Sequence, residues 1–417
     1  MNVLFLSLLD FNSITEHNIY TDLLREFVKH GHNIYAVSPV ERRCNLDTYI
    51  VSKENARILK LRIGNIQKTN VIEKGLSMLM IERQYIEGVK RYFKGIKFDL
   101  VLYPTPPITL VGVVKYIKKR DNAVTYLMLK DIFPQNAVDM QMLSKTGIKG
   151  LLYHHFRKKE KTLYAISDHI GCMSQANVDY VLRHNPEIGE KQVEICPNSI
   201  EAQEIRISDS ERAELRRKYQ IPLKKTVFVY GGNLGKPQGI PFLIDCLKTQ
   251  LDNPEAFFLI VGNGTEFEKL KTFFGEYRPE NMRLMKTLPR EDYDRMIASC
   301  DVGMIFLDHR FTIPNFPSRL LSYMQAGLPV LACTDSNTDI GKVIEEGGFG
   351  WWCESNNICA FDKILKKISK ENLNVPGTKG FHFLKDNYAS NVSYETIIDK
   401  FSAINKNRRT ISEGSVD

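Results

Sequence analysis

The stretch FPSRLLSYMQAGLPVLA, residues 316–332, carries the pattern that decides the fold. Apolar residues at helical spacing run from Arg319 to Ala326 and stop at Gly327, and an apolar run with the length of a buried strand follows. Ser318 is a favourable N-cap for this short helix. A helix that leads into a buried strand is typical of an α/β fold with a parallel sheet.

The same alternation of strand and helix patterns runs along the whole chain. Buried-strand runs in the first half occur at 98–104, 123–129 and 169–174, with helical patterns between them. The pattern restarts after residue 200, and 417 residues exceed what one core usually serves. We therefore predict an α/β protein with two Rossmann-like doubly wound domains, at 1–200 and 201–387, that face a cleft.

The basic residues are concentrated in the first half of the chain. The sequence has 57 Lys and Arg against 49 Asp and Glu, and residues 1–200 hold 28 basic and 20 acidic residues, which is the whole excess of +8. This asymmetry indicates a polyanionic partner or an anionic membrane surface, or a solvated basic face with no partner. The helical pattern at 72–95 mixes apolar and basic residues, so it is either a core helix or one that rests on an anionic inner leaflet.

Cysteine usage and hydropathy indicate a cytoplasmic protein. None of the eight cysteines forms a CxxC pair, and most lie in apolar runs, which predicts reduced core residues and no metal bound by cysteine. No run of 18 uncharged apolar residues occurs, so we expect no transmembrane helix. The first residues lack the basic segment of a signal peptide.

Small residues follow two strands of the second half, in YGGNLGKPQG at 230–239 and VGNG at 261–264. Glycine lets a backbone approach a ligand closely, although any α/β fold also uses glycine in ordinary tight turns. Arg319 is unexpected in a first helical turn, because the helix dipole prefers an acidic residue there. A bound diphosphate would resolve that conflict; the alternative is an ion pair with a nearby carboxylate.

Two further candidates lie in the first half. LKDIFPQN places Lys130 and Asp131 at a strand end, where Lys130 could stabilise negative charge and Asp131 could orient a hydroxyl group. The alternative is that Asp131 caps the following turn and pairs with Lys130. His17, in the loop after the first strand, is an acceptor-side candidate.

Six motifs in order carry a resemblance to a known family. They are GHNIYAVSP near the start, KDIFPQN at 130–136, ICPNSIE at 195–201, GNLGKPQG at 232–239, VGNGTEFEKLK at 261–271 and the FPSR stretch at 316–332. Together they resemble the family 4 glycosyltransferases, which have the GT-B fold. The resemblance extends from Met1 to about Ile404 and is nearest to bacterial surface-polysaccharide enzymes of the N-acetyl-fucosaminyl transferase-like branch.

The resemblance implies a retaining transfer of a hexosyl or N-acetylhexosaminyl group from a nucleotide-sugar, a UDP-sugar in this branch, with no metal and no cofactor. The nucleotide would bind the second domain and a lipid-linked or growing glycan acceptor the first, in capsule or exopolysaccharide synthesis. The protein would be cytoplasmic, with peripheral contact at the inner face of the membrane and no nucleic-acid partner. A helix at 388–404 would cross back to the first domain, before a flexible polar tail at 405–417.

The family motifs assign roles residue by residue. The implied catalytic residues are Lys130, Asp131 and Arg319; the implied donor-binding residues are Gly232, Asn233, Lys236, Gln238, Gly262, Gly264, Phe316, Pro317, Ser318 and Ser322. The chain departs from the family where Pro314 and Ser322 replace two glutamates, so Ser322 offers only a neutral contact to a ribose. Asn233 and Gln238 stand where many members have Arg and Lys, which leaves Lys236 and Arg319 as the cationic residues.

Two other functions remain open from the sequence. A nucleotide-sugar 2-epimerase shares the two-domain shape but would use acid and base side chains in the cleft. A non-catalytic partner subunit that binds a sugar nucleotide fits the loss of the two glutamates. Transfer or donor hydrolysis separates the enzyme from this subunit.

Overall fold

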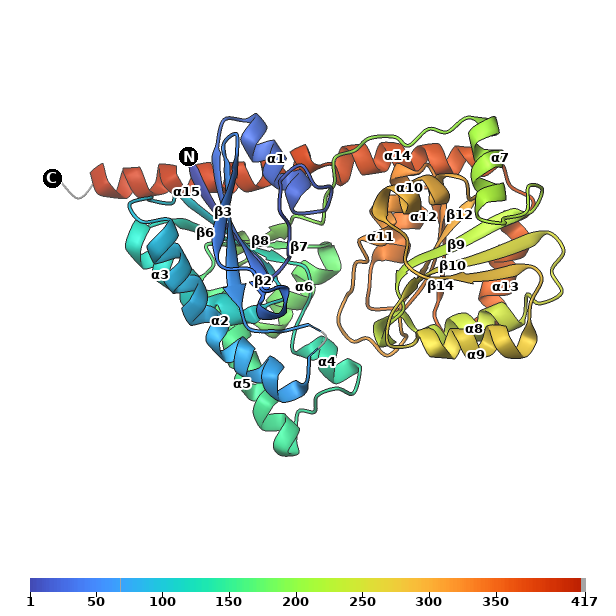
Figure 1. Cartoon of the computed structure of the whole chain (residues 1–417), viewed down its shortest axis with the longest axis horizontal. Coiled ribbons are helices and arrows are strands. Elements are labelled where there is room, and N and C mark those ends of the chain that lie inside the picture. The colour runs from blue at the N-terminus through green and yellow to red at the C-terminus, as the bar shows by residue number, and fades with distance from the viewer. Residues whose placement is uncertain (68, 414–417) are drawn as a thin grey trace. The chain divides into compact units, whose positions relative to one another are not determined.

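The computed structural model describes residues 1–67 and 69–413, and it divides into two compact units. Unit 1 contains Met1–Glu201 and the chain from Ala389 onward, and unit 2 contains Ala202–Tyr388. Both units carry a largely parallel sheet with helices packed on it (Figure 1). The predicted α/β fold with two Rossmann-like, doubly wound domains is confirmed.

The sheet of unit 1 has eight strands in the order β3-β4-β2-β1-β5-β6-β7-β8. All neighbours are parallel except β3, which pairs antiparallel with β4 at the edge. The strands are β1 Asn2–Leu6, β2 Asn33–Glu41, β3 Tyr49–Lys53, β4 Ala56–Ile63, β5 Leu100–Thr105, β6 Val124–Leu129, β7 His169–Cys172 and β8 Val193–Ile195. The strand order reverses between β1 and β5, so loops at their carboxyl ends border a switch point of the kind where α/β proteins bind ligands.

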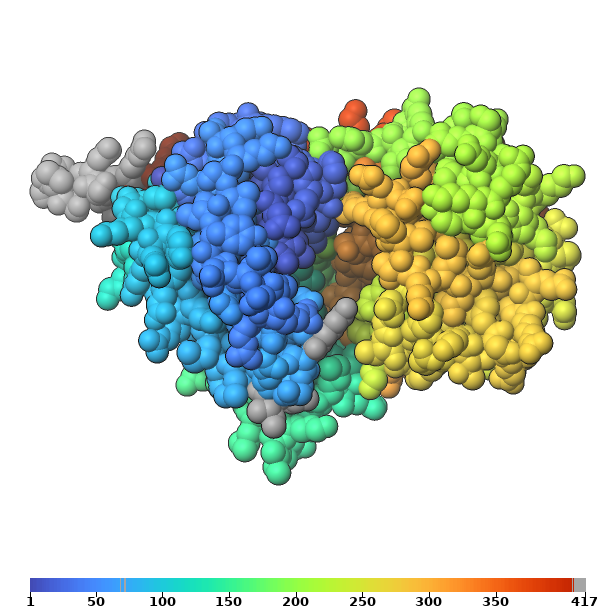
Figure 2. Space-filling view, viewed as in Figure 1, coloured from blue at the N-terminus to red at the C-terminus, as the bar shows by residue number. Residues whose placement is uncertain are grey.

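Helices connect these strands and bury their apolar sides against the sheet. They are α1 Thr21–Lys29, α2 Val71–Tyr92, α3 Val111–Asp121, α4 Gln135–Asp139, α5 Gly147–Ile166 and α6 Gln175–His184, with short 3₁₀ turns η1 Arg42–Cys44, η2 Ile108–Leu110 and η3 Glu190–Gln192. The apolar side of α1 packs into one core with β1, β2, β5 and β6. Helix α2, blue in Figure 2, packs on β4 and on the segment η2–α3.

The last helix, α15 at Ser390–Glu413, packs against α1 in unit 1. Tyr394 meets the ring of Phe27 edge-on at 4.9 Å, and Arg408 donates to the Asn122 carbonyl oxygen at 2.7 Å. The flexible tail that we predicted at 405–417 is therefore wrong as far as Glu413; residues 414–417 lie outside the described part. The polar composition misled the prediction, because no Gly or Pro interrupts the helix after Ser390 and a surface helix tolerates polar residues.

Unit 2 has six parallel strands in the order β11-β10-β9-β12-β13-β14. The strands are β9 Thr226–Asn233, β10 Ala256–Asn263, β11 Met282–Met285, β12 Val302–Phe306, β13 Val330–Thr334 and β14 Gly350–Glu354. The helices are α7 Asp209–Lys218, α8 Ile240–Lys248, α9 Phe267–Tyr277, α10 Arg290–Ala298, α11 Arg319–Gln325, α12 Ile340–Glu346, α13 Ile358–Ile368 and α14 Asn374–Asn387, with η4 at Lys236–Gln238. Here the order reverses between β9 and β12.

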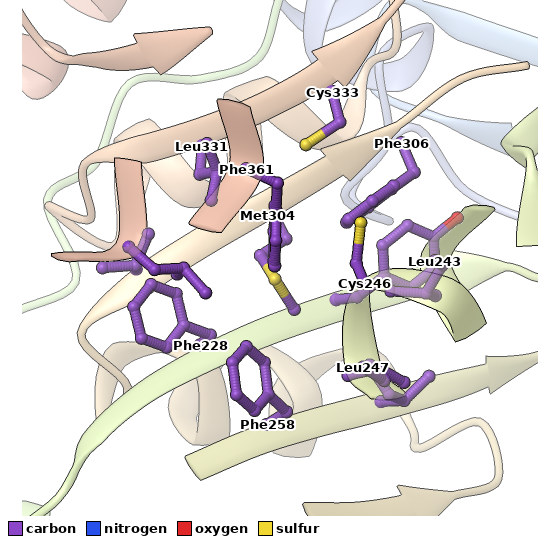
Figure 3. Packing of buried hydrophobic residues seen from close by; sticks show 14 of the residues in the cluster. Phe228, Leu243, Cys246, Leu247, Phe258, Met304, Phe306, Leu331, Cys333 and Phe361 are labelled. Atoms are coloured by element: carbon purple, nitrogen blue, oxygen red, sulfur yellow. The ribbon is translucent and has the colours of Figure 1, made fainter. Parts of the chain in front are cut away.

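The core of unit 2 lies between the sheet and the helices α8 and α13. Figure 3 shows Phe228, Phe258, Met304 and Leu331 from four neighbouring strands packed beneath Phe361. The rings of Phe228 and Phe258 stack at 5.2 Å between centroids. Rigid packing of this kind fixes the strand ends, and with them the loops that follow.

Of the eight cysteines, six are buried as predicted, while Cys44 and Cys359 are exposed. In the part of the chain that the structure describes, no cluster of three or more His, Cys, Asp or Glu side chains could hold a metal ion. No described helix has the length and apolar character needed to cross a bilayer.

The chain enters and leaves unit 2 at one place on unit 1. Ile200 forms a parallel β-bridge with Ala389, and the Ser390 amide donates to the Ile200 carbonyl oxygen at 2.9 Å. Close by, Glu201 pairs with Arg25 at 3.0 Å. The two crossings are thereby held together within unit 1.

Candidate functional site

The loops after β9 and β12 touch at the switch point of unit 2. The Asp308 amide donates to the Pro237 carbonyl oxygen at 3.0 Å. Gly239, which has a φ of +56°, leaves its Cα close to the Leu307 carbonyl oxygen, where an added Cβ would come within 3.1 Å. A side chain at this position is disfavoured by both the conformation and the contact. The sequence therefore brings two strand-end loops into one surface.

Two of the predicted donor-binding glycines, Gly262 and Gly264, are packed closely against backbone, and a third, Gly232, has an unusual conformation. Gly232 has a φ of +114°. A Cβ on Gly262 would lie 1.9 Å from the Gly232 carbonyl oxygen, and one on Gly264 would lie 2.4 Å from the backbone of Leu234. The backbones of the two strand ends approach each other so closely here that a side chain would not fit. Ordinary structural packing is therefore sufficient to explain why Gly262 and Gly264 are glycines.

Arg319 lies directly beside the first of these loops. Its guanidinium carbon is 4.3 Å from the ring centroid of Tyr230, and its Nη2 donates weakly to the Asn233 carbonyl oxygen at 3.5 Å. Its Nη1 is buried and has no hydrogen-bond partner. Within residues 1–67 and 69–413 no carboxylate forms an ion pair with Arg319, so the alternative pairing is absent there.

Buried tyrosines surround this arginine, and sequence reasoning missed them. The Tyr323 hydroxyl accepts from the Gly231 amide at 3.0 Å and donates to the Met304 carbonyl oxygen at 3.1 Å, while the Tyr230 hydroxyl donates to Asn233 at 3.0 Å. Burial raises the pKa of Tyr323 to about 12. The phenols therefore stay neutral and leave the charge of the guanidinium uncompensated. Tyr323 lies in the same short helix as Arg319, and this position was the sequence feature that could have pointed to the tyrosines.

The other polar residues of the β9 loop hold one another. The Gln238 Oε1 accepts from the Gly235 amide and from Asn233 Nδ2, both at 3.1 Å. Lys236 is exposed and makes no ion pair in the described chain. The structure thus brings Asn233 and Gln238 together as the frame of the loop and leaves Lys236 as its cation.

The FPSR segment differs in detail from the prediction. Ser318 has helical dihedrals, φ −65° and ψ −14°, and its side chain makes no capping hydrogen bond, so the predicted N-cap is wrong. An N-cap needs extended dihedrals to aim its oxygen at the following amides. Phe316 is buried against Tyr388, with ring centroids 5.9 Å apart, and Pro317 is half-buried beside it. Ser322 is half-buried on α11, three residues after Arg319.

In unit 1, Lys130 and Asp131 follow β6 as predicted, but they do not pair with each other. Lys130 Nζ donates to the Cys196 carbonyl oxygen at 3.2 Å, and burial lowers the pKa of Lys130 to about 8. Asp131 Oδ2 accepts from Asn136 Nδ2 at 2.6 Å, and its Oδ1 is buried without a partner. Burial raises the pKa of Asp131 to about 6. Paired shifts of this kind, with an unsatisfied oxygen, are typical of functional sites.

Thr105 joins this strand end to the neighbouring one. Its Oγ1 accepts from the Lys130 amide and donates to the Asp131 carbonyl oxygen, both at 3.2 Å. The end of β5 therefore fixes the backbone that presents both titratable groups. Asn136 and Thr105 were missed, although Asn136 lies in the quoted motif KDIFPQN.

His17 lies in a different network of unit 1. Its ring is about half exposed, and its Nδ1 is 3.0 Å from Arg25 Nη2 and 3.6 Å from Asp22 Oδ1. Both partners belong to α1, so the structure places His17 at the beginning of that helix.

A buried lysine, also missed from the sequence, anchors the loop after β1. Lys60 is 1% exposed, pairs with Asp10 and donates to the Phe11 carbonyl oxygen at 2.9 Å and to Ser38 Oγ at 3.2 Å. Because a buried ammonium needs such partners, the loop conformation depends on this lysine.

Comparison with known proteins adds to this geometry. Residues 211–377 match the family described as Glycosyl transferases group 1. The chain is 24% identical over 81% of its length, and 81% of the relative, to a probable glycosyltransferase, WbjE, of Pseudomonas aeruginosa. It is 21% identical over 60% of each chain to a putative colanic acid biosynthesis glycosyl transferase, WcaI, of Escherichia coli K12.

Solved structures share the fold. Sucrose-phosphate synthase from Thermosynechococcus elongatus superposes with a TM-score of 0.76 at 14% identity, over 97% of this chain and 99% of that one. HepE of Anabaena in complex with UDP-glucose gives 0.67 at 13% identity, over 97% and 100%. The matches support a glycosyltransferase with the GT-B fold.

Proposed function

We propose that the protein is a retaining, metal-independent glycosyltransferase that moves a hexosyl or N-acetylhexosaminyl group from a UDP-sugar to a lipid-linked or growing glycan. The observation that carries the proposal is the uncompensated guanidinium of Arg319 beside the β9 loop. UDP as the nucleotide is supported by a structural neighbour that holds UDP-glucose, and surface-polysaccharide synthesis is supported by a relative named for colanic acid biosynthesis.

The donor side of the reaction needs a cation where the diphosphate leaves. The acceptor oxygen bonds to the anomeric carbon, the bond from that carbon to the diphosphate oxygen breaks, and the acceptor proton passes to the departing phosphate. Negative charge develops on the diphosphate in this step, and a preorganised cation stabilises it. Arg319 supplies that cation, with the exposed Lys236 as the second candidate.

The acceptor side is assigned to the end of β6. Asp131, ionised above a pKa of about 6, would orient a hydroxyl of the sugar or of the acceptor. Lys130, with a pKa of about 8, would carry a positive charge at neutral pH. His17 stays an acceptor-side candidate only because it lies in the loop that follows β1. A lipid-linked acceptor would place this reaction at the inner face of the cell membrane.

A thermal-shift screen tests the nucleotide first. The purified protein is heated with UDP, GDP, ADP or CMP, each with and without EDTA. A ligand at about 100 times its dissociation constant stabilises the folded state by about 2.7 kcal/mol. We expect a shift with UDP alone that EDTA does not change. Loss of the shift in EDTA would contradict metal independence, and no shift with any nucleotide would contradict the donor site.

Donor turnover then separates the enzyme from a binding subunit. The protein with UDP-glucose or UDP-N-acetylglucosamine is expected to release UDP slowly, by transfer to water. If the wild-type protein binds the UDP-sugar but releases no more UDP than Asp131→Asn does, the non-catalytic subunit is favoured. Conversion of one UDP-sugar into its C2 epimer would establish the epimerase instead.

A further inference from the structure

Two tyrosines of unit 2 are seated on glycines of its sheet. A Cβ on Gly231 would lie 1.9 Å from the hydroxyl oxygen of Tyr293, and one on Gly303 would lie 2.3 Å from Cγ of Tyr323. Gly231 belongs to β9 and Gly303 to β12, so each strand leaves open the space that one phenol occupies. Neither glycine has a positive φ, so the contact with the tyrosine, and not the backbone conformation, requires glycine.

Tyr293 is the middle residue of DYD at 292–294, which has the spacing of an acidic metal-binding motif. The two carboxylates are engaged in ion pairs with basic side chains. Asp292 pairs with Lys218 at 3.0 Å, and Asp294 pairs with Arg290 at 3.3 Å. The residue of this motif that reaches the β9 loop is therefore the tyrosine.

Tyr323 bridges β9 and β12 at the point where the two strands separate. The last pair in their ladder is Val229 with Gly303. Beyond it, the Tyr323 hydroxyl accepts from the Gly231 amide at 3.0 Å and donates to the Met304 carbonyl oxygen at 3.1 Å. The phenol oxygen thus takes the place of a hydrogen bond between the strands, at the switch point of the sheet.

The hydroxyl of Tyr293 adds a further link, because it hydrogen-bonds the Tyr323 hydroxyl. Tyr323 gives its single proton to Met304, so Tyr293 is the donor in this bond. Burial raises the pKa of Tyr293 well above its ordinary value, and the phenol keeps the proton that the bond needs. Phenylalanine at either position would fill the same space but interrupt this chain of hydrogen bonds.

The two phenols reach both parts of the donor site. Arg319 is four residues before Tyr323 in α11 and therefore lies on the same side of that helix. Gly231 precedes Gly232, where an added Cβ would lie 3.6 Å from Nη2 of Arg319. A shift of either tyrosine would thus change the spacing between the guanidinium and the β9 loop.

We infer that Tyr293 and Tyr323 are positioning residues for the donor, and that together they hold Arg319 and the β9 loop at the spacing that a diphosphate needs. The inference rests on the proposed function and extends it to α10, which takes part through a side chain that acts only on other protein groups. A preorganised cation stabilises the charge of a transition state better than a loosely held one. Loss of the hydroxyls should therefore lower turnover as well as affinity.

Calorimetric titration with UDP, together with the rate of UDP release from saturating UDP-sugar, tests the inference on the full chain. Tyr293→Phe and Tyr323→Phe are each expected to raise the dissociation constant for UDP about tenfold and to lower the saturated rate about tenfold, which is the scale of one hydrogen bond. The double variant should lose about as much as Tyr323→Phe alone, because the two hydroxyls act as one chain.

The matched control is Tyr85→Phe in unit 1. Tyr85 is fully buried, and its hydroxyl donates to the Ser7 carbonyl oxygen at 2.6 Å. The control should lower the thermal midpoint, as the other two variants do, but leave the affinity for UDP unchanged. All measurements are made at a temperature where every variant is folded, so that loss of stability alone changes neither affinity nor rate.

A second pair of variants tests the contact itself. Gly231→Ala is expected to weaken UDP binding at least about tenfold, because the new methyl group would displace the Tyr293 phenol. In a Tyr293→Ala background the space is free, and the same change should cost less than about twofold more. Equal losses in the two backgrounds would contradict the contact.

The outcomes separate this inference from the proposed function. If the wild type binds UDP and both phenylalanine variants match it in affinity and rate, the positioning role is wrong and the donor site stands. If the wild type binds no UDP, the donor site is contradicted and the positioning role falls with it. Reduced affinity in both phenylalanine variants, with normal affinity in Tyr85→Phe, would support the inference.

Discussion

The guanidinium carbon of Arg319 lies 4.3 Å from the ring centroid of Tyr230, so a cation rests on the face of a buried phenol. This contact restricts the arginine to one orientation without neutralising it, because a neutral ring attracts a cation through its quadrupole. Nη1 is buried and has no hydrogen-bond partner. The ring of Tyr230 thus holds the guanidinium beside the β9 loop before any ligand arrives, and preorganisation of this kind favours the binding of an anion there.

Replacing Arg319 with alanine should weaken UDP binding by about 1.5–3 kcal/mol, the contribution of a charged hydrogen bond. Calorimetric titration with UDP measures the change. Arg295, which pairs with Glu211 at the surface of unit 2, provides the control, and Arg295→Ala should bind UDP normally. Equal affinities for the two variants would remove Arg319 from the donor site.

The ring of Tyr230, more than its hydroxyl, should matter for UDP affinity. Tyr230→Leu is expected to weaken UDP binding by about 0.5–2 kcal/mol, since the cation–π contact is lost. Tyr230→Phe keeps the ring and should bind nearly as well as the wild type. If the phenylalanine variant loses as much affinity as the leucine variant, the hydrogen bond to Asn233 holds the arginine instead.

Asp131→Asn should lower turnover about 10²–10⁴-fold and leave UDP affinity within about twofold, because a positioned carboxylate contributes on this scale. Burial raises the pKa of Asp131 to about 6, so the wild-type carboxylate is protonated at pH 5 and ionised at pH 7. The wild-type rate should therefore fall as the pH drops below about 6. A pH–rate profile of both proteins checks this. If the rate of Asp131→Asn falls at low pH in the same way as the wild-type rate, the titration belongs to another group.

The same carboxylate should lower the stability of the fold near neutral pH. The pKa is raised on folding, so the folded state holds the proton more tightly than the unfolded chain does. The stabilisation that comes from the protonated Asp131 carboxyl is complete below the unfolded pKa of 3.8. It is lost as the pH rises through about 6. Asp131→Asn should thus be more stable than the wild type by about 1–3 kcal/mol at pH 7 and lose that advantage near pH 4. Urea unfolding at the two pH values measures the difference.

Gly262 and Gly275 should respond oppositely to alanine. A Cβ on Gly262 would meet the Gly232 carbonyl oxygen at 1.9 Å, so Gly262→Ala should cost about 1–3 kcal/mol of stability and weaken UDP binding. Gly275, in α9, has open space around the added atom, and Gly275→Ala should stabilise the protein by about 0.5–1 kcal/mol. Thermal unfolding compares the two, and similar losses would contradict the contact.

Local patterns in the sequence predicted the strands, the restart of the fold and the loops that carry glycine. Arg319 could be singled out because it contradicts the dipole of its own helix. Its tyrosine partner could not, because Tyr230 and Arg319 meet only through the tertiary packing of β9 against α11. The Ser318 cap was predicted from residue type alone, but Ser318 has helical dihedrals, which a local residue preference does not determine.

Unit 1 shows the same limit. Lys130 and Asp131 were predicted from their strand end, but adjacency in sequence suggested a pair, whereas a strand end turns neighbouring side chains apart. Lys60 could not be identified, since its burial depends on Asp10 and Phe11 from a loop fifty residues earlier. Burial of polar groups is decided by long-range packing, and no local pattern records it.

The bridge between Ile200 and Ala389 makes unit 2 an insertion into unit 1. The chain of unit 1 is interrupted once, between Glu201 and Ala389, and unit 2 is the inserted segment. The two ends of the insertion leave unit 1 from neighbouring backbone positions. Insertions with adjacent ends are those that proteins exchange and recombine most readily. One half of the protein could therefore be replaced as a cassette, with a new specificity introduced, while every strand pairing of the other half is kept.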